Sequence, residues 1–333
     1  MKLKDLRVLV TGGAGFIGSC LVDTLIQEGC LVRVIDNLIN GKRENLIQHR
    51  DNSPFQFIRG DIINPLDAVK AINGMDIVFH LACLGVRHSI KRPLENHRIN
   101  AEGTLLVLEE SYKAGIKKFI YCSSSEVYGT AEYVPMSERH PTNPCTVYGA
   151  SKLAGEAYTR AYYKTYGLKT VIIRPFNTYG PRSHHEGDAG EMIPKSIVRA
   201  LNGQPILIFG DGSQTRDYTY VQDIARGLVE AAKCDDLTGL TFNIGSNSEI
   251  SIKQIAEMIL EMIGTHSSQI EYLKNRPGDV LRLYADSTAF KERANWNPKV
   301  SFEDGLLKTV QWFKSRPEGI RALLNQEKGV NWE

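Results

Sequence analysis

Short, unbroken runs of hydrophobic residues recur through the first half of the chain, with longer stretches of helical spacing between them. The runs predict six β-strands, over Leu6–Val10, Leu31–Ile35, Phe55–Arg59, Ile77–Leu81, Phe119–Cys122 and Thr170–Arg174. Helical periodicity covers Phe16–Gln27, Leu94–Ala114 and Tyr148–Tyr166. Because strands that are apolar on both faces need a cover on both sides, this alternation predicts an α/β fold in which a doubly wound parallel sheet lies between helices.

After Pro175 the pattern loosens. The polar stretch 180–190 predicts a loop, and the segment after Pro317 shows no pattern. Helices are predicted over Ile193–Leu201, Ile252–Ile263 and Glu303–Phe313, and short strands over Ile206–Phe209, Tyr218–Val221 and Thr241–Ile244. We interpret residues 176–333 as a smaller α/β region over the carboxyl-terminal edge of the sheet formed by residues 1–175, although strands of the two parts can interleave.

The bulk composition fits a soluble globular protein. Of 333 residues, 42% are hydrophobic and 23% are charged. Lys and Arg number 40 and Asp and Glu 38, and the net charge of +2 gives no reason to expect nucleic acid or a membrane as a partner. The six cysteines form no Cys-x-x-Cys pair, so no metal site is predicted. Because neither a signal peptide nor a run of roughly 20 apolar residues is visible, we expect a cytoplasmic location.

A glycine-rich turn joins the first predicted strand to the first predicted helix. Gly12, Gly15 and Gly18 follow a Gly-x-x-Gly-x-x-Gly pattern. Without a Cβ atom the backbone can turn tightly and approach a pyrophosphate, which then lies at the helix N-terminus beside Phe16 and Ile17. The turn and its flanking elements predict a Rossmann-type dinucleotide-binding domain in the first part of the chain.

Three further strand ends carry the residues expected around the dinucleotide. Asp36 ends the second strand, and a carboxylate there accepts hydrogen bonds from the ribose hydroxyls and repels a 2′-phosphate, so NAD is favoured over NADP. Asp61, after the third strand, either meets the adenine edge or caps a helix. The end of the fourth strand either passes under the cofactor or only packs the sheet. The other cofactor contacts predicted at these strand ends are Asn37, Ile62, Leu81 and Ala82.

Tyr148 and Lys152 form a reactive set with serines upstream. The two residues are four apart on a predicted helix and therefore share one face. A phenol with a pKa of about 10 is a poor base at neutral pH, but a neighbouring ammonium group and the positive nicotinamide ring stabilise its phenolate. Ser124, at the end of the fifth strand, can hydrogen-bond the same substrate hydroxyl. The set predicts removal of a proton from a hydroxyl while the nicotinamide takes a hydride from the same carbon.

These motifs are similar in order and spacing to the extended short-chain dehydrogenase/reductase family, and within it to the NAD-dependent nucleotide-sugar epimerases and dehydratases. The similar stretches are 11–18, 123–129, 148–156, 174–182, 209–223 and 276–286. The resemblance implies that Tyr148 is the catalytic base, that Lys152 tunes it and holds the nicotinamide ribose, and that Ser124 assists. The residues that it adds around the NAD cofactor are Asn100, Ser123 and Pro175.

The resemblance also implies where a nucleoside-diphosphate sugar binds. Arg216 and Arg276 clamp its diphosphate, because guanidinium groups bind phosphate oxygens in pairs. Asp279 reaches the nucleoside ribose. Asn177 contacts the ligand backbone, and Ser125 lies at the sugar. From the residues alone, each arginine could instead form a surface or interdomain ion pair.

Two local patterns disagree about the reaction. The stretch 124–129 resembles the Thr-Ser-Glu run of GDP-mannose-type dehydratases and the equivalent run of sugar-nucleotide decarboxylases. In a 4,6-dehydratase, Glu126 would remove the C5 proton of a 4-keto sugar and help to expel the C6 hydroxyl. Ser125 stands where dTDP-glucose dehydratases usually have an aspartate, which disfavours that substrate. The stretch 276–279, Arg-Pro-Gly-Asp, instead resembles the epimerases.

Of these two patterns, Glu126 receives more weight, because a buried carboxylate beside a keto sugar is costly without a task. The leading hypothesis is therefore a nucleotide-sugar 4,6-dehydratase that works through a 4-keto hexose. The alternative is a 4-epimerase similar to UDP-glucose 4-epimerase, in which Glu126 only begins a helix or forms an ion pair. A nucleotide-uronate decarboxylase and an NAD-binding protein without catalysis are the remaining alternatives.

Two expectations concern other parts of the chain. Consecutive histidines in a polar loop rarely converge on one metal ion, so the stretch 184–188, His-His-Glu-Gly-Asp, predicts either a plain surface loop or a loop that covers the substrate, in preference to a metal site. The resemblance implies a homodimer, paired through the helices over 94–114 and 148–166. It also places the nucleobase near Phe209 and Asp211.

Overall fold

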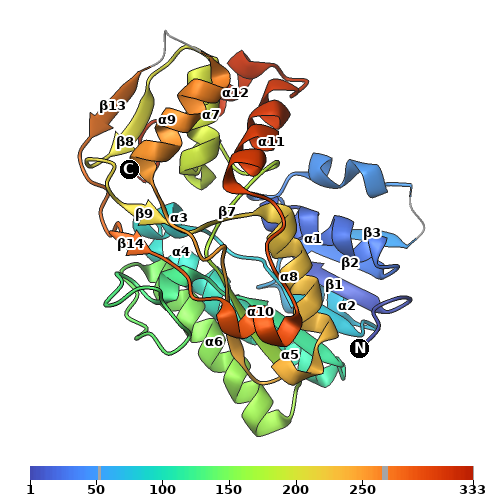
Figure 1. The fold of residues 1–333 in the computed structure, drawn as a ribbon. Helices are drawn as coiled ribbons and strands as arrows, with labels where there is room; N and C mark the ends of the chain where they lie inside the picture. Colours follow the sequence, from blue (N-terminus) through green and yellow to red (C-terminus); the bar gives the residue numbers. More distant parts are fainter. Residues whose placement is uncertain (52–53, 265–268, 333) are drawn as a thin grey trace.

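The computed structural model describes residues 1–51, 54–264 and 269–332, and its largest feature is a seven-stranded parallel sheet (Figure 1). The strands are β1 (Arg7–Thr11), β2 (Leu31–Asp36), β3 (Phe55–Arg59), β4 (Ile77–His80), β5 (Lys118–Cys122), β6 (Thr170–Pro175) and β11 (Thr241–Ile244). Their order is β11-β6-β5-β4-β1-β2-β3, and all neighbouring pairs are parallel. The predicted α/β class with a doubly wound sheet is confirmed. The chain direction across the sheet reverses between β1 and β4, where sheets of this type bind ligands.

Helices cover both faces of the sheet because its strands are apolar on both faces. Along β1, Val8 and Val10 belong to one hydrophobic core and Leu9 to the other, as alternation along a strand requires. The first core is closed by α1 (Phe16–Gln27) and α8 (Val221–Lys233), which pack against each other. The second core is closed by α2 (Pro65–Ile72), α5 (Gly103–Lys113) and α6 (Val147–Tyr166).

The structure corrects the position of one predicted strand. Thr241–Ile244 was assigned to the smaller region, but it is β11, the edge strand of the large sheet. Phe242 pairs with Ile173 of β6, and its apolar side chain is buried in the hydrophobic core that α8 closes. A local pattern predicts a strand but does not say which sheet it joins. The division of the chain at residue 175 therefore stays a prediction, since residues 176–333 contribute to both regions.

A second correction concerns the helix predicted over Leu94–Ala114. The structure divides it into α4 (Pro93–His97), a π-helical turn η2 (Arg98–Glu102) and α5. Such wider turns are often found at functional sites. Here α4 packs against both this turn and α3 (Val86–Lys91), which follows the loop after β4.

The smaller region is built from short paired strands and four helices. Its pairs are β8 (Ile206–Phe209) with β13 (Ile270–Leu273), β7 (Asn177–Tyr179) with β10 (Tyr218–Tyr220), and β9 (Thr215–Arg216) between β12 (Ile250–Ser251) and β14 (Arg282–Leu283). The helices α7 (Met192–Leu201), α9 (Ile252–Ile263), α11 (Phe302–Lys314) and α12 (Ile320–Gln326) share a separate hydrophobic core. The remaining elements are η1 (Arg43–His49), η3 (Ser125–Val127), η4 (Gly187–Ala189), η5 (Asp235–Leu237) and α10 (Thr288–Ala294). In Figure 1 the paired strands β8 and β13 lie with α7 and α9 above the large sheet.

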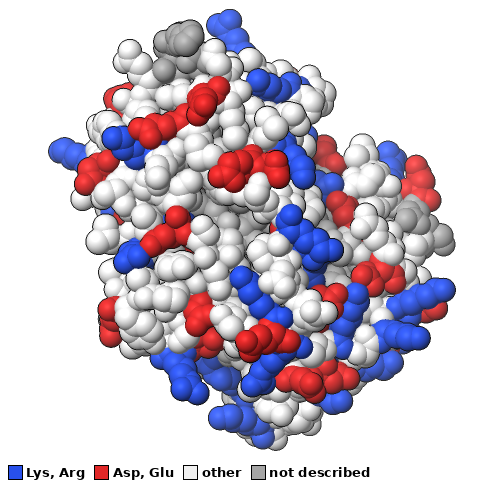
Figure 2. Space-filling model, viewed as in Figure 1, with Lys and Arg blue, Asp and Glu red and all other residues white. Residues whose placement is uncertain are grey.

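Charged side chains of both signs are interspersed over the face shown in Figure 2, without a broad area of one sign. This agrees with the net charge of +2. Within the described ranges, no helix combines the length and the apolar character needed to cross a membrane.

Candidate active site

One cavity lies where the large sheet meets the smaller region, and it gathers almost all of the predicted site residues. The predicted residues on its wall are Gly12, Gly15, Phe16, Ile17, Gly18, Asp36, Asn37, Asp61, Ile62, Leu81, Ala82, Ser123, Ser124, Ser125, Glu126, Tyr148, Lys152, Pro175, Asn177, Arg216, Arg276 and Asp279. Residues at the ends of β2, β5 and β6, and residues that directly follow β1 and β4, therefore meet residues from β7, β9 and the loop before β14, as expected for a site at the carboxyl ends of parallel strands.

The glycine turn leaves no room for side chains. Gly12 has φ +68°, and a Cβ atom on it would lie 2.8 Å from the backbone of Ala82 at the end of β4. A Cβ atom on Gly18 would lie 2.2 Å from the carbonyl oxygen of Gly12. The turn, the first residues of α1 and β4 are thus packed backbone against backbone, which is the arrangement that a dinucleotide pyrophosphate requires.

Asp36 closes β2 on the same wall. Its two carboxylate oxygens accept hydrogen bonds from the backbone N–H groups of Ala14 (3.0 Å) and Leu38 (2.8 Å). Burial raises the pKa of this carboxyl, and the two backbone hydrogen bonds oppose the rise. Each oxygen keeps a second lone pair for a ribose hydroxyl. Asn37 donates a hydrogen bond to Asp61 (3.0 Å), which joins the ends of β2 and β3, so this wall fits the adenosine half of NAD.

We expect Gly12→Ala to weaken NAD binding about tenfold or more, because the new Cβ would collide with the backbone of Ala82 at a positive φ. Titration calorimetry with NAD measures the change. Gly115→Ala is the matched control: Gly115 has φ +69° with nothing within 4 Å, so it carries the backbone strain without the collision. An equal loss of NAD affinity in both variants would contradict the fit of the turn to the cofactor.

Tyr148, Lys152 and Ser124 meet on the opposite wall. Ser124 and Tyr148 line the same cavity, and the Ser124 side chain lies close enough to the phenol to act on it. Burial raises the pKa of Tyr148, as does Cys83 beside it, whereas the Lys152 ammonium and the Ser124 side chain lower it. Burial alone would lower the pKa of Lys152, but Cys83, Tyr121 and Tyr148 raise it and keep this side chain cationic. Lys152 Nζ also donates to the carbonyl oxygen of Cys122 at 2.8 Å. The cation that a phenolate needs is therefore fixed next to it.

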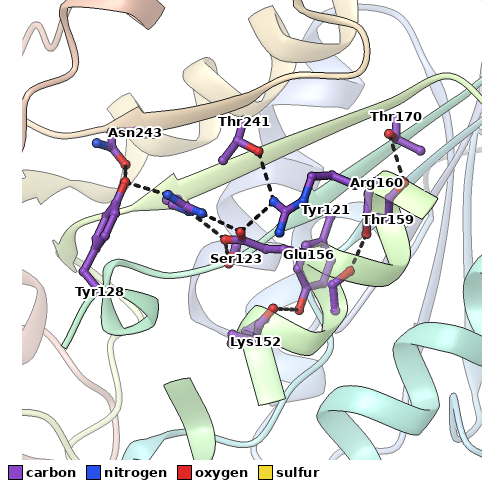
Figure 3. Close-up of polar contacts among 12 residues, drawn as sticks. Tyr121, Ser123, Tyr128, Lys152, Glu156, Thr159, Arg160, Thr170, Thr241 and Asn243 are labelled. Carbon is purple, nitrogen blue, oxygen red and sulfur yellow. Dashed lines mark hydrogen bonds and ion pairs between the residues drawn. The ribbon is translucent and has the colours of Figure 1, made fainter. Parts of the chain in front are cut away.

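A buried ion pair holds the helix that carries this set against the sheet (Figure 3). Glu156 of α6 is fully buried and accepts two hydrogen bonds from Arg174 of β6, at 2.7 and 2.6 Å. Arg174 also donates to the hydroxyl of Tyr128 (2.8 Å), which donates to Asn243 of β11 (2.7 Å). Ser123, predicted as a cofactor contact, lines the cavity but donates its hydroxyl to Glu156 at 2.6 Å. The network therefore links α6 to β5, β6 and β11.

Glu126 lies in η3. Its backbone N–H donates a hydrogen bond to the hydroxyl of Ser124 (3.2 Å), which caps this turn. Among the residues that the structure describes, none forms a hydrogen bond or ion pair with its carboxylate. Burial raises the pKa of Glu126, and Arg276 and Arg216 oppose the rise. A carboxyl group with a raised pKa and no partner, on the wall of a cavity, is suited to acid–base work.

The two arginines that were predicted to clamp a diphosphate form a three-residue cluster with Asp279. Asp279 Oδ1 accepts hydrogen bonds from Arg216 (2.9 Å) and Arg276 (2.6 Å), so one carboxylate oxygen bridges both guanidinium groups. Nε of Arg276 is buried without a hydrogen-bond partner, and so is Oδ1 of Asn177 on the same wall. These free groups leave capacity for a polar ligand.

The structure does not place Asn100 on the cavity wall, where it was predicted to line the cofactor. Its amide donates to the carbonyl oxygen of Leu84 (2.9 Å) and accepts from the N–H of Leu84 (2.8 Å). Asn100 lies in the π-helical turn, and its two hydrogen bonds with Leu84 hold the loop between β4 and α3 in place. Its contact is therefore with the loop that lines the cavity.

Several residues on the wall were missed by sequence reasoning. Arg87 of α3 forms no ion pair or hydrogen bond with any described residue, and burial together with Arg276 lowers its pKa to about 10. Further missed residues on the wall are Glu191, Lys195, Arg199, Asn331 and Trp332. No motif marks them: Glu191, Lys195 and Arg199 lie at the start of α7 and along it, and Asn331 and Trp332 lie in the stretch after Pro317 that shows no pattern.

The loop 184–188 closes one side of the cavity. Glu186 pairs with Nδ1 of His184 (3.0 Å) and with Lys42 from the loop after β2 (2.9 Å). His184 and Asp188 line the cavity. Within residues 1–51, 54–264 and 269–332, no three His, Cys, Asp or Glu side chains are grouped so as to hold a metal ion. The loop thus bridges the large sheet and the smaller region.

The sequence and the fold of the chain are similar to those of known enzymes of one family. Residues 8–245 match the model of the NAD dependent epimerase/dehydratase family. The chain is 37% identical to UDP-glucose 4-epimerase of Mycolicibacterium smegmatis over 94% of its own length and 100% of the relative. It is 35% identical to UDP-glucuronic acid decarboxylase 1 of Arabidopsis thaliana, covering 98% of this chain and 72% of that protein. The crystal structure of the dTDP-glucose 4,6-dehydratase DesIV of Streptomyces venezuelae, with NAD bound, superimposes with a TM-score of 0.89 at 31% identity, over 93% of this chain and 98% of that one.

Proposed function

The chain belongs to the NAD-dependent epimerase/dehydratase family, and from this premise we propose that it inverts C4 of the hexose in a nucleoside-diphosphate sugar. The protein is an NAD-dependent enzyme of the nucleotide-sugar epimerase/dehydratase type. Similar proteins include epimerases, decarboxylases and a dehydratase, so the family alone leaves the final step open.

The observation that carries the proposal is the meeting of Ser124, Tyr148 and Lys152 on the cavity wall. When bound, NAD accepts a hydride from the substrate and returns it. The Tyr148 phenolate takes the proton of the C4 hydroxyl, Ser124 orients that hydroxyl, and Lys152 stabilises the phenolate. Tyr148 then returns the proton to the oxygen of the 4-keto sugar. Inversion requires only that the keto sugar turns over before it is reduced, so these three side chains suffice.

Mass spectrometry of nucleotide sugars incubated with the protein and NAD in deuterated water tests the proposal. UDP-, GDP-, CDP- and dTDP-hexoses are offered in parallel. We expect a product of unchanged mass, without deuterium on carbon and with a new retention time. A product that has lost one water and gained one deuterium would instead establish dehydration.

A 4,6-dehydration is the second candidate, and the free carboxyl of Glu126 favours it. Placed beside a 4-keto sugar, this group could remove the C5 proton and return a proton to the departing C6 hydroxyl. Dehydration was the leading hypothesis from the sequence. It takes second place because inversion needs no residue beyond the reactive set, and because relatives of similar length that match this chain at 37% identity are epimerases.

Glu126→Gln separates the two candidates. We expect this variant to keep C4 inversion within about threefold, because no proton of that reaction passes through Glu126. Loss of a general acid–base in a dehydratase would instead lower turnover about 10²–10⁴-fold. Initial rates at saturating substrate decide between these outcomes. The Kd of NAD, measured for both proteins, controls for correct folding of the variant.

We further propose a homodimer formed through α5 and α6. Large apolar side chains are exposed on these helices: Leu105 (39%), Tyr112 (44%), Tyr163 (37%) and Tyr166 (50%). The rings of Tyr112 and Tyr166 also lie in contact, with centroids 5.2 Å apart, and exposed apolar surface of this kind is typical of an interface. A cytoplasmic location stays a prediction.

A further inference from the structure

The family resemblance places the nucleobase of the substrate near Phe209, and we propose that residues 327–332 form a further wall of that subsite, in which Trp332 packs against the base. The inference rests on the proposed function, since it names the part of the site that receives the base. Figure 1 shows the chain end beside β8 and β9, the two strands that carry Phe209 and Arg216. Leu207, Phe209, Gln214 and Trp332 all line the cavity that holds the reactive set.

The segment is tied to the smaller region through α7. Glu327, with a side chain only 3% exposed, forms ion pairs with Lys195 (3.3 Å) and Arg199 (2.9 Å) of that helix. Lys195 Nζ also donates to the carbonyl oxygen of Gly329 at 2.8 Å. The buried carboxylate of Glu327 needs both Lys195 and Arg199 as partners, because an underpaired buried charge is costly. These ion pairs fix the position of the start of the segment.

The end of the segment is tied to the loop that closes the cavity. Asn331 is 1% exposed, and its Nδ2 donates to the carbonyl oxygens of Gly187 (3.1 Å) and Gly190 (2.8 Å). Its Oδ1 is buried and has no hydrogen-bond partner among the described residues. A buried acceptor without a donor is costly, and a residue on the wall of a ligand cavity can take its donor from the ligand.

These anchors hold Trp332 against Phe209. The ring centroids are 4.5 Å apart and the rings are inclined by 72°, an edge-to-face pair. The carbonyl oxygen of Phe209 already accepts a bond from Gln214 Nε2 at 2.7 Å, which fixes the backbone under the ring. The faces of the Phe209 and Trp332 rings are apolar and flat. Asn331, which directly precedes Trp332, has the free acceptor Oδ1. A planar heterocycle with an N–H group matches both features, as each nucleobase does.

The position along the chain agrees with a nucleotide. Phe209 precedes Arg216 by seven residues, and the loop between them leads directly to the Arg216–Asp279–Arg276 cluster. A diphosphate held by that cluster therefore has its nucleoside on the side of Phe209 and Trp332. The hexose then extends toward Glu126 and Tyr148, which line the same cavity.

Binding of UDP and GDP to the complete protein tests the inference, with intrinsic fluorescence and calorimetry as readouts. We expect both nucleotides to quench the wild-type emission, since Trp332 lies on the cavity wall. Trp332→Phe should lose this quenching while the Kd changes within about threefold. Trp332→Ala should raise the Kd of UDP and GDP about tenfold or more, as loss of an aromatic contact to a base does. The affinity of inorganic pyrophosphate, which has no base, and that of NAD should stay unchanged.

Tyr272→Ala is the matched control, because Tyr272 is a half-exposed aromatic residue of β13 that is absent from the wall of this cavity. Unchanged nucleotide affinity in Trp332→Ala, or an equal loss of pyrophosphate affinity, would overturn the subsite and leave the proposed function standing. Failure of the wild-type protein to bind any nucleoside diphosphate while it binds NAD would overturn the proposed function itself.

Discussion

Tyr148→Phe is expected to lower turnover about 10²–10⁴-fold while NAD and nucleotide sugar still bind, which is the usual contribution of a general acid–base. The substitution removes one hydroxyl and keeps the ring that fills the cavity wall. Without the phenolic oxygen, the proton of the C4 hydroxyl has no basic acceptor, since the Ser124 hydroxyl is only a weak base and Lys152 is cationic. Steady-state kinetics with a substrate that the wild-type protein converts measures the effect.

Tyr162→Phe is the control for this variant, because Tyr162 lies on the same helix but donates its hydroxyl to Glu109 (2.7 Å), away from the cavity. It should retain full turnover. The pH profile gives a second readout. Because burial raises the pKa of Tyr148, kcat/KM of the wild-type protein should increase as pH rises and the phenol loses its proton. Residual activity above a tenth of the wild type in Tyr148→Phe would exclude Tyr148 as the base.

Arg174→Met is expected to destabilise the fold by about 3–5 kcal/mol, because it leaves the carboxylate of Glu156 buried without its main partner. Glu156 is fully buried and Arg174 is 4% exposed, so water cannot replace the lost bonds. Urea unfolding followed by circular dichroism measures the loss. Arg160→Met removes another cation from the same carboxylate, but the Arg160 side chain is 36% exposed, so we expect at most about 1 kcal/mol.

The same pair makes stability depend on pH. Burial alone would raise the pKa of Glu156, but the hydrogen bonds and charge of Arg174 lower it below its ordinary value of 4.5. A carboxyl group whose folded-state pKa is lowered contributes stability above its unfolded pKa, and this contribution is lost as pH falls through the folded value. The wild-type protein should therefore lose stability below about pH 4.5 more steeply than Arg174→Met. Parallel pH curves for the two proteins would show that the pair is not the cause.

The sequence predicted the elements of the large sheet well because buried parallel strands are marked by their own composition. The limits of β3 agree with the prediction, and those of β5 differ by one residue. The partners of each element were harder to predict, since pairing depends on residues far apart in the chain. Thr241–Ile244 shows this: its pattern is that of a strand, and only packing against β6 and α8 decides its sheet.

Residues of the candidate site could be predicted where they belong to a short sequence motif. They could not be predicted where the fold brings them together from distant parts of the chain. The glycine turn and the Tyr148–Lys152 pair are motifs of the first kind. Glu156 has the sequence context of an ordinary helix residue, and only Arg174 beside it explains its burial. Trp332 follows a stretch without periodicity, so its place on the cavity wall could not be read from the sequence.

The pairing of β11 with β6 also bears on how the chain folds during synthesis. Until residue 244 has left the ribosome, the edge of β6 has no neighbour on that side, and until residue 233 has left it, the apolar face that α8 covers is exposed. An uncovered strand edge is a template for association with other chains. A fragment that ends at residue 175 would therefore expose both surfaces at once, and we expect it to aggregate and not to persist as an independent dinucleotide-binding unit. Nascent chains shorter than about three quarters of the protein would depend on chaperones until the last strand of the sheet arrives.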